Sequence, residues 1–222
     1  MKIAVLFSGG KDSCLALHLA KEQGHEISYL LNINVENKDS FMFHKPELKL
    51  LKMQAKELGI KLIIQKSKGE KEAELVDLET LIKKANVEGI VVGGIASSYQ
   101  GNRIKKICDK LNIQFIAPLW NLTSEQVWEK LLNNNFKIIL TKIACEGISK
   151  EFIGKIITKE KFEELKKLSE KYKFRLDFEG GEAESCVLYM PEFKNEIKIK
   201  FSIKSENNYR HFLILKNTPT LI

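Results

Sequence analysis

The sequence predicts an α/β protein: a Rossmann-like, doubly wound parallel sheet followed by a second, smaller α+β domain. In the first 120 residues, short runs of Val, Ile and Leu alternate with amphipathic helical segments. A parallel sheet covered by helices on both faces requires that pattern. After Pro118 the alternation stops, and two helical segments are followed by a stretch in which apolar and polar residues alternate strictly. We therefore expect one domain over residues 1–120 and another over residues 121–222.

The first domain is expected to contain five strands and four helices. The apolar runs predict strands at residues 3–7, 27–33, 61–64, 89–92 and 114–117. The intervening segments predict helices at residues 14–23, 46–58, 75–85 and 104–111. In the third helix, Leu75, Leu78, Ile82 and Ala85 recur at steps of three and four, which places them on one helical face.

The second domain is expected to contain helices at residues 124–132 and 159–172. Between residues 197 and 204, Ile and Phe alternate with Lys and Ser, which predicts one half-exposed, antiparallel strand. Trp120 and Trp128 are expected to anchor cores, the latter on the same helical face as Val127 and Leu131.

Composition narrows the class of protein. With 222 residues, 44% of them apolar, the chain has the make-up of a soluble globular protein. The formal charge of +7 suits an anionic ligand such as a nucleotide, but Lys-rich helices in water account for it, so no stable nucleic-acid complex is expected. The four cysteines form no CxxC pair, which favours a reducing compartment without structural zinc. No signal peptide and no run of about 20 apolar residues is present, so we expect a cytoplasmic protein that does not contact membranes.

The most informative segment is the 8–13 loop, Ser8-Gly9-Gly10-Lys11-Asp12-Ser13, between the first strand and the first helix. Glycines allow the backbone to turn sharply, so that several N–H groups and the positive end of the helix dipole meet at one point. Lys11 can neutralise phosphate charge, and the hydroxyls of Ser8 and Ser13 can donate hydrogen bonds. Asp12 can hold Mg²⁺ or cap the helix. All six residues are therefore predicted to bind ATP.

The loop has other interpretations. Neither GxxxxGK[ST] nor GxGxxG occurs, so the usual P-loop and dinucleotide motifs do not apply. The simplest alternative is a tight strand-to-helix turn in which Asp12 or Ser13 caps the helix.

The loop resembles the PP-loop of the adenine nucleotide alpha hydrolase superfamily, whose members split ATP between the α and β phosphates. Further stretches resemble one branch of it, the diphthine-ammonia ligases. These are SFMFH at 40–44, GEKE at 69–72, GGIASSYQGNR at 93–103, PLW at 118–120 and EGGEAES at 179–185. The family usually has EGGEYET, so Ala183 replaces a tyrosine and Ser185 a threonine. The length resembles the short archaeal form.

The resemblance implies a function. ATP and Mg²⁺ would activate the carboxylate of diphthine on elongation factor 2 as an acyl adenylate, and ammonia would displace AMP to leave an amide. The 8–13 loop would hold the departing pyrophosphate, with Lys11 and Asp12 acting in catalysis. Glu182 and Glu184 would also act in catalysis, by taking a proton from ammonium or binding the trimethylammonium of diphthine.

Further site residues are implied by the same resemblance. Gly93, Gln100 and Arg103 would bind ATP near the α-phosphate; a helix start with an exposed arginine is the alternative. The substrate would be bound by these residues: His44, Tyr99, Glu179, Gly180, Gly181, Glu182 and Glu184. The alternative for the glutamates is a hairpin turn exposed to water, and the alternative for His44 is a packing or surface role.

Two other functions stay open from the residues alone. A PP-loop tRNA-modifying adenylase would suit the positive charge, and a non-catalytic ATP-binding sensor could use the same sheet. No cysteine occupies the setting of a glutaminase nucleophile, so the expected nitrogen source is free ammonia or ammonia handed over by a partner.

Overall fold

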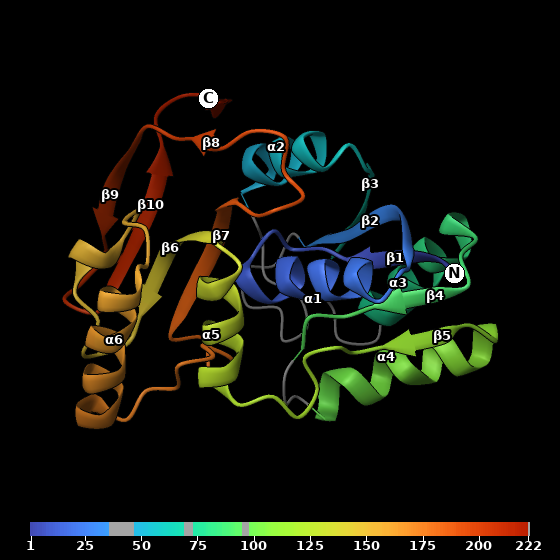
Figure 1. Ribbon diagram of the computed structural model, residues 1–222, viewed down its shortest axis with the longest axis horizontal. Coiled ribbons are helices and arrows are strands. Elements are labelled where there is room, and N and C mark those ends of the chain that lie inside the picture. Colours follow the sequence, from blue (N-terminus) through green and yellow to red (C-terminus); the bar gives the residue numbers. More distant parts are fainter. Residues whose placement is uncertain (36–46, 69–72, 95–97, 222) are drawn as a thin grey trace. The chain divides into compact units, whose positions relative to one another are not determined.

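The structure is a computed structural model that describes residues 1–35, 47–68, 73–94 and 98–221, without the side chains of residues 98–100 (Figure 1). The chain divides into two compact units, Met1–Asn121 and Leu122–Ile222. No helix in the described ranges is long and apolar enough to cross a lipid bilayer.

A parallel sheet of five strands forms the centre of the first unit, in the order β3-β2-β1-β4-β5. The strands are β1 (Lys2–Leu6), β2 (Glu26–Val35), β3 (Lys61–Ser67), β4 (Gly89–Val91) and β5 (Gln114–Ile116). The chain runs outward from β1 to β3 and then returns to β4, so the strand order reverses between β1 and β4. Ligands of open α/β sheets bind beyond the carboxyl ends of the strands at such a reversal.

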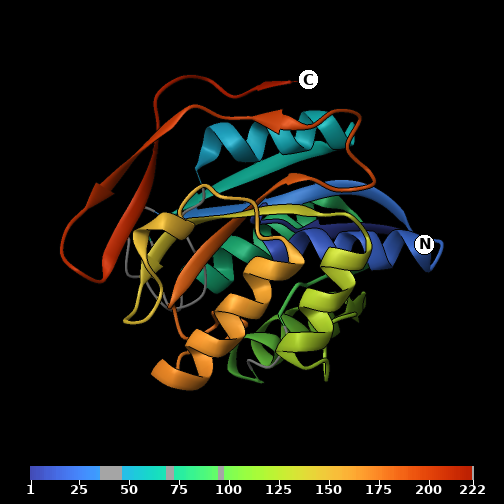
Figure 2. The same ribbon diagram turned by 60° about the vertical axis from the view of Figure 1, so that its left-hand side comes forward.

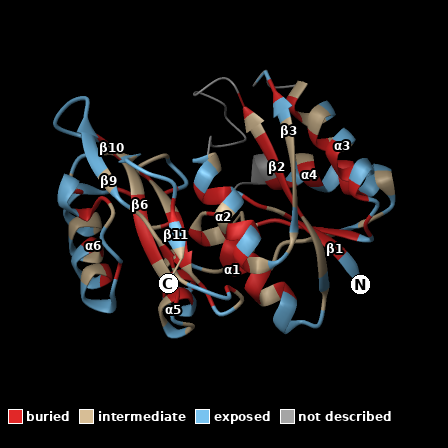
Figure 3. Cartoon of the chain, turned by 90° about the horizontal axis from the view of Figure 1, so that it is seen from above, coloured by how far each residue is buried: buried red, intermediate tan, exposed pale blue. Residues whose placement is uncertain are grey.

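Helices cover both faces of this sheet, which confirms the predicted doubly wound fold. Figure 3 shows α1 (Lys11–Glu22) and α2 (Leu48–Leu58) on one side of β1 to β3, and α3 (Ala73–Ala85) and α4 (Ser98–Leu111) on the other. The side chains of Leu31, Ile33 and Val35 pack with α3 and α4. Because side chains alternate along a strand, Asn32 lies on the opposite face.

Some helices begin at residues other than predicted. The first begins at Lys11 rather than Cys14, because Gly10 adopts the extended backbone of an N-cap. The second begins at Leu48, where the side chain of Glu47 accepts a hydrogen bond from the backbone N–H of Lys49. The fourth begins at Ser98 rather than at Ile104, so the motif SYQGNR is helical.

The second unit is α+β, as predicted. Its antiparallel sheet has the order β7-β6-β10-β9, and β8 pairs separately with β11. The strands are β6 (Lys137–Ala144), β7 (Ala183–Tyr189), β8 (Ile197–Lys198), β9 (Phe201–Ser205), β10 (Arg210–Leu215) and β11 (Thr220–Leu221). The helices are α5 (Ser124–Asn133), the short 3-10 helix η1 (Lys150–Phe152) and α6 (Lys159–Tyr172). The β9–β10 hairpin is red in Figure 2.

The prediction of one continuous strand over residues 197–204 is wrong. The stretch forms β8 and β9, which belong to different sheets and have different partners. Ile197 is fully buried, whereas Ile203 is 41% exposed. Alternation of apolar and polar residues indicates an extended chain, but it does not show where the chain changes its hydrogen-bonding partner.

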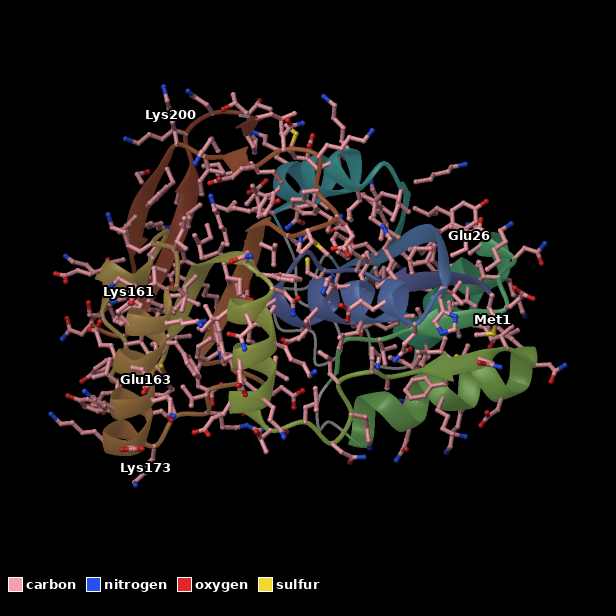
Figure 4. The ribbon with its side chains drawn as sticks, in the orientation of Figure 1. Met1, Glu26, Lys161, Glu163, Lys173 and Lys200 are labelled. Atoms are coloured by element: carbon pink, nitrogen blue, oxygen red, sulfur yellow. The ribbon has the colours of Figure 1, made fainter. Side chains whose placement is uncertain are left out.

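Aromatic side chains form much of the core beneath α5 and α6. Trp128 is fully buried, stacks on Phe162 with ring centroids 5.2 Å apart, and meets the edge of Phe178 at 6.2 Å. Its predicted role as a core anchor is confirmed. In α6, the side chains of Lys161 and Glu163 differ in exposure: Glu163 is exposed, whereas Lys161 is half-buried and its Nζ lies 4.7 Å from the centroid of the Phe152 ring (Figure 4). In the first unit, Trp120 is only partly buried, but it lies close to Gly101 on α4.

Candidate functional site

The 8–13 loop connects β1 to α1 at the carboxyl edge of the parallel sheet. Gly9 has a φ of +74°, a conformation that residues with a Cβ rarely adopt. Gly10 is the N-cap of α1, and its position carries no capping side chain. The alternative in which Asp12 or Ser13 is the N-cap is therefore wrong. The first turn of α1 instead presents backbone N–H groups and the positive end of the helix dipole at the loop.

The serine hydroxyls hold the loop in shape. Ser13 Oγ donates to the carbonyl oxygen of Gly10 at 3.1 Å and accepts from the N–H of Ser8 at 3.3 Å. The hydroxyl oxygens of Ser8 and Ser13 lie 3.1 Å apart. Ser8 is exposed and Ser13 is buried, so Ser8 is the better placed of the two to meet a ligand.

The two charged residues of the loop form an ion pair. Lys11 Nζ lies 2.7 Å from Asp12 Oδ2, and the Lys11 side chain is 2% exposed. The positive charge predicted to meet phosphate is therefore balanced by a carboxylate beside it. The ammonium of Lys11 is therefore held in one position near the helix N-terminus and does not move freely in solvent.

Two buried amides fix the loop from outside, and the sequence analysis missed both. Asn32 Nδ2, on β2, donates to the carbonyl oxygen of Phe7 at 2.9 Å. Gln54 Nε2, on α2, donates to the carbonyl oxygen of Gly9 at 2.8 Å. Asn32 is 5% exposed and Gln54 is 1% exposed. A polar residue inside the apolar run LLNIN was the available signal for Asn32; no comparable signal marked Gln54.

The residues after β4 meet the same loop. A Cβ placed on Gly93 would lie 2.7 Å from the backbone carbon of Asp12 and from the backbone nitrogen of Ser13. Only glycine allows β4 to pass so close to the first turn of α1. Gly93 therefore lies beside the 8–13 loop, and its role in binding ATP stays a prediction.

The other residues of the first unit that were predicted near ATP or substrate are Arg103, Tyr99, Gln100 and His44. Arg103 lines a groove between α3 and α4, together with Leu75 and Lys106. Tyr99 and Gln100 lie in the first turn of α4, and their side chains are outside the described part of the chain, as is the whole of His44.

In the second unit, the EGGE motif belongs to the 175–184 turn, which joins the end of α6 to β7. Arg175 Nε and Nη2 donate to the two carboxylate oxygens of Asp177, at 2.9 and 2.6 Å. Asp177 also accepts from the N–H of Glu179 at 3.0 Å and from Ser124 Oγ at 3.3 Å. The hydrogen bond to Asp177 raises the pKa of Arg175. Sequence reasoning missed both residues, although they directly precede the motif.

The backbone of this turn is left-handed at two positions, Phe178 with φ +64° and Gly181 with φ +85°. The N–H of Gly181 donates to the carbonyl oxygen of Phe178 at 3.0 Å. A Cβ on Gly180 would lie 2.5 Å from Glu182 Oε1. The left-handed backbone favours glycine at 181, whereas a Cβ at 180 would displace only the carboxylate of Glu182. Trp128 Nε1 holds the beginning of the turn by donating to the carbonyl oxygen of Leu176 at 2.9 Å.

The three glutamates of the motif have different partners. Glu179 Oε2 lies 3.5 Å from Arg175 Nη2. Glu182 Oε1 accepts from the backbone N–H of Arg175 at 3.2 Å, and its Oε2 is a buried oxygen that accepts no hydrogen bond from the described residues. Glu184 Oε1 pairs with Lys142 Nζ at 2.9 Å, across the β6–β7 pairing. These glutamates are held by the protein rather than lying free in water.

Carboxylates are concentrated around the turn. Asp177, Glu179, Glu182 and Glu184 supply four of them, and Arg175 and Lys142 are cations that pair with members of this set. Such a concentration of carboxylates favours a cationic ligand.

The cysteines have the character of structural residues. Burial raises the pKa of Cys186 to about 12 and of Cys108 to about 11. Burial and then the carboxylate of Glu182 raise the pKa of Cys145 to about 11. Thiols with such pKa values are protonated at neutral pH and are poor nucleophiles.

Comparison with known proteins agrees with the two-part architecture. The model of the diphthamide synthase N-terminal domain matches residues 1–115, and that of the C-terminal domain matches residues 123–219. The diphthine–ammonia ligases of Homo sapiens and Bos taurus are each 32% identical over 226 residues, which cover 91% of this chain and 84% of theirs. The ligase of Schizosaccharomyces pombe is 30% identical, and the match covers 89% of this chain but 36% of that longer protein. The chain therefore belongs to the diphthamide synthase family.

Proposed function

We propose that this protein is an ATP-dependent ligase that converts the carboxylate of diphthine on elongation factor 2 into the amide of diphthamide, using ammonia. The observation that carries the proposal is the match of both family domains, in order, along nearly the whole chain. The geometry of the 8–13 loop supports the use of ATP.

The proposed reaction has two steps. A carboxylate oxygen of diphthine attacks the α-phosphorus of ATP, the bond to the β-phosphate breaks, and pyrophosphate leaves. Ammonia then attacks the acyl carbon of the adenylate. The bond between that carbon and the oxygen of AMP breaks, AMP leaves with the electron pair, and the nitrogen loses one proton. The first step is needed because a free carboxylate has a poor leaving group and a negative charge that repels nucleophiles.

The 8–13 loop would bind the phosphates that leave. Its backbone N–H groups and the helix dipole favour anions, and Lys11 adds one positive charge at the same place. In this proposal, phosphate oxygens compete with the carboxylate of Asp12 for the ammonium of Lys11. That exchange stabilises the charge that accumulates on pyrophosphate as the α–β bond breaks.

Mg²⁺ would come with ATP. Magnesium in nucleotide sites is commonly held by one or two carboxylates together with phosphate oxygens and water. Asp12 supplies one carboxylate on the first turn of α1, beside the proposed phosphate site, so the residues present fit this mode. The ion would neutralise phosphate charge there.

The 175–184 turn would serve the substrate or ammonia. Its cluster of carboxylates favours the trimethylammonium of diphthine or an ammonium ion. The buried oxygen Glu182 Oε2 is the acceptor most in need of a donor, and ammonium can supply one. Glu179 and Glu184 would support the negative field.

The test is incubation of the protein with diphthine-bearing elongation factor 2, ATP, Mg²⁺ and ammonium, followed by mass spectrometry of the factor and analysis of the nucleotides. We expect an amide on the factor and stoichiometric AMP and pyrophosphate. ADP and phosphate as products would refute the proposed chemistry. Binding of ATP without any product would favour the sensor function instead. A substrate on a translation factor also implies that the protein acts in the cytoplasm.

A further inference from the structure

We infer that Gln54 and Asn32 are positioning residues of the nucleotide site: Gln54 directs the N–H of Gly10 toward the phosphates, and Asn32 fixes the N–H of Ser8, which closes the loop. The inference rests on the proposed use of ATP and adds residues outside the loop to that site. Both side chains are buried polar groups in a largely apolar setting, at 1% and 5% exposure. A buried amide without a partner is costly, so these contacts with loop carbonyls are strongly preferred.

The effect on the loop follows from peptide geometry. A trans peptide unit is planar, so its carbonyl and the N–H of the next residue point in opposite directions. Asn32 holds the carbonyl of Phe7 and thereby fixes the N–H of Ser8. Gln54 holds the carbonyl of Gly9 and thereby fixes the N–H of Gly10 on the side away from α2.

These two N–H groups are not equally engaged. The Ser8 N–H donates to Ser13 Oγ at 3.3 Å, and so helps to close the loop. The Gly10 N–H has only a long contact of 3.4 Å, with the exposed hydroxyl of Ser8. It is therefore the donor that an oxyanion can most easily take, and Gln54 sets its direction.

The contact also explains why residue 9 is glycine. A Cβ on Gly9 would lie 2.0 Å from Gln54 Oε1. Gly9 thus satisfies two requirements at once, the left-handed backbone and the approach of the buried amide. The loop and α2 are interlocked at this point.

The test uses Gln54→Leu and Asn32→Leu in the full chain, with Gln65→Leu as the matched control. Gln65 Nε2 also donates to a backbone carbonyl, that of Lys66 at 3.1 Å, but on β3 and in an exposed setting. The dissociation constant of Mg·ATP, the thermal stability without nucleotide and the shift of the Gly10 amide resonance on adding Mg·ATP would be measured for each.

For Gln54→Leu and Asn32→Leu we expect the dissociation constant to rise about threefold to tenfold, the value of one amide–carbonyl hydrogen bond. The change in the Gly10 amide chemical shift on adding Mg·ATP should be smaller in Gln54→Leu than in the wild type. The Gln65→Leu control should match the wild type. Unchanged affinity in folded variants would refute this inference alone, as would a loss confined to thermal stability. If the wild-type chain does not bind Mg·ATP, the proposed function fails, and this inference with it.

Discussion

The 8–13 loop and the 175–184 turn are both built around two adjacent glycines, yet they present opposite charge. In the loop, side chains hold backbone carbonyls, so that N–H groups and the positive end of a helix dipole meet at one place. In the turn, carboxylates lie close together, and Arg175 and Lys142 pair with them. Similar glycine signals therefore say only that the backbone must bend. The surrounding partners decide whether the bend attracts an anion or a cation.

The largest effect should come from the charge at the centre of the loop. We expect Lys11→Ala to lower ATP-dependent amide formation about tenfold to a hundredfold, since a charge-assisted hydrogen bond contributes about 1.5 to 3 kcal/mol. The rate of AMP release measures it. Lys21→Ala is the control, because Lys21 lies in the last turn of the same helix and is exposed. Wild-type turnover by Lys11→Ala would mean that the loop binds phosphate through its backbone alone.

The next largest effect should come from Asp177, which holds the 175–184 turn. We expect Asp177→Ala to lower the free energy of unfolding of the second unit by roughly 2 to 3 kcal/mol. The value is below that of a fully buried pair because the Arg175 side chain is 54% exposed. Urea denaturation measures it. In the matched control Glu164→Ala, which breaks a surface pair with Lys161 in the same unit, the loss should be about 0.5 kcal/mol or less. Equal losses would show that Asp177 does not organise the turn.

A smaller effect is expected where this chain departs from its family, at Ala183. The residue is 5% exposed on β7 and lies opposite the fully buried Ile143. A tyrosine there would overpack the sheet, so Ala183→Tyr should lower the free energy of unfolding by about 1.5 kcal/mol. Ser202→Tyr, on the exposed strand β9, is the control. A variant as stable as the wild type would contradict this prediction, and would show that the sheet accommodates the larger side chain.

Local sequence predicted the loop better than the turn, and the physical reason is range. The loop lies between a strand and a helix that are adjacent in sequence, so its glycines were enough to predict its position and its sharp bend. The turn depends on residues far along the chain: Trp128 and Ser124 from α5, and Lys142 from β6. Sequence pattern could therefore find its glutamates but not their partners. Gln54 was missed for the same reason, since it acts 45 residues away from Gly9.

The sheet shows the same limit. Apolar runs were enough to predict all five strands of the parallel sheet, because helices cover both of its faces, although the edge strands β3 and β5 are only partly buried. In the second unit, residues 197–204 show one alternating pattern, but they form two strands that belong to different sheets. Pairing is a long-range property that a single strand does not encode.

The smallest expected effect tests whether either region contains a thiol that makes ammonia from glutamine. A glutaminase needs a nucleophilic cysteine, as thiolate or beside a base. Cys14 follows the loop but is fully buried within α1. Beside the turn, burial raises the pKa of Cys186 to about 12, and burial together with Glu182 raises the pKa of Cys145 to about 11. A raised pKa keeps each thiol protonated at pH 7, so neither should attack an amide.

With glutamine in place of ammonium, we expect no diphthamide from the pure protein. With ammonium, we expect Cys145→Ala and Cys186→Ala to retain activity within about twofold, which corresponds to about 0.4 kcal/mol. Mass spectrometry of the elongation factor measures both. Amide formation from glutamine that Cys145→Ala or Cys186→Ala abolishes would instead make the negative turn a site of nitrogen transfer from glutamine, and would remove the need for free ammonium there.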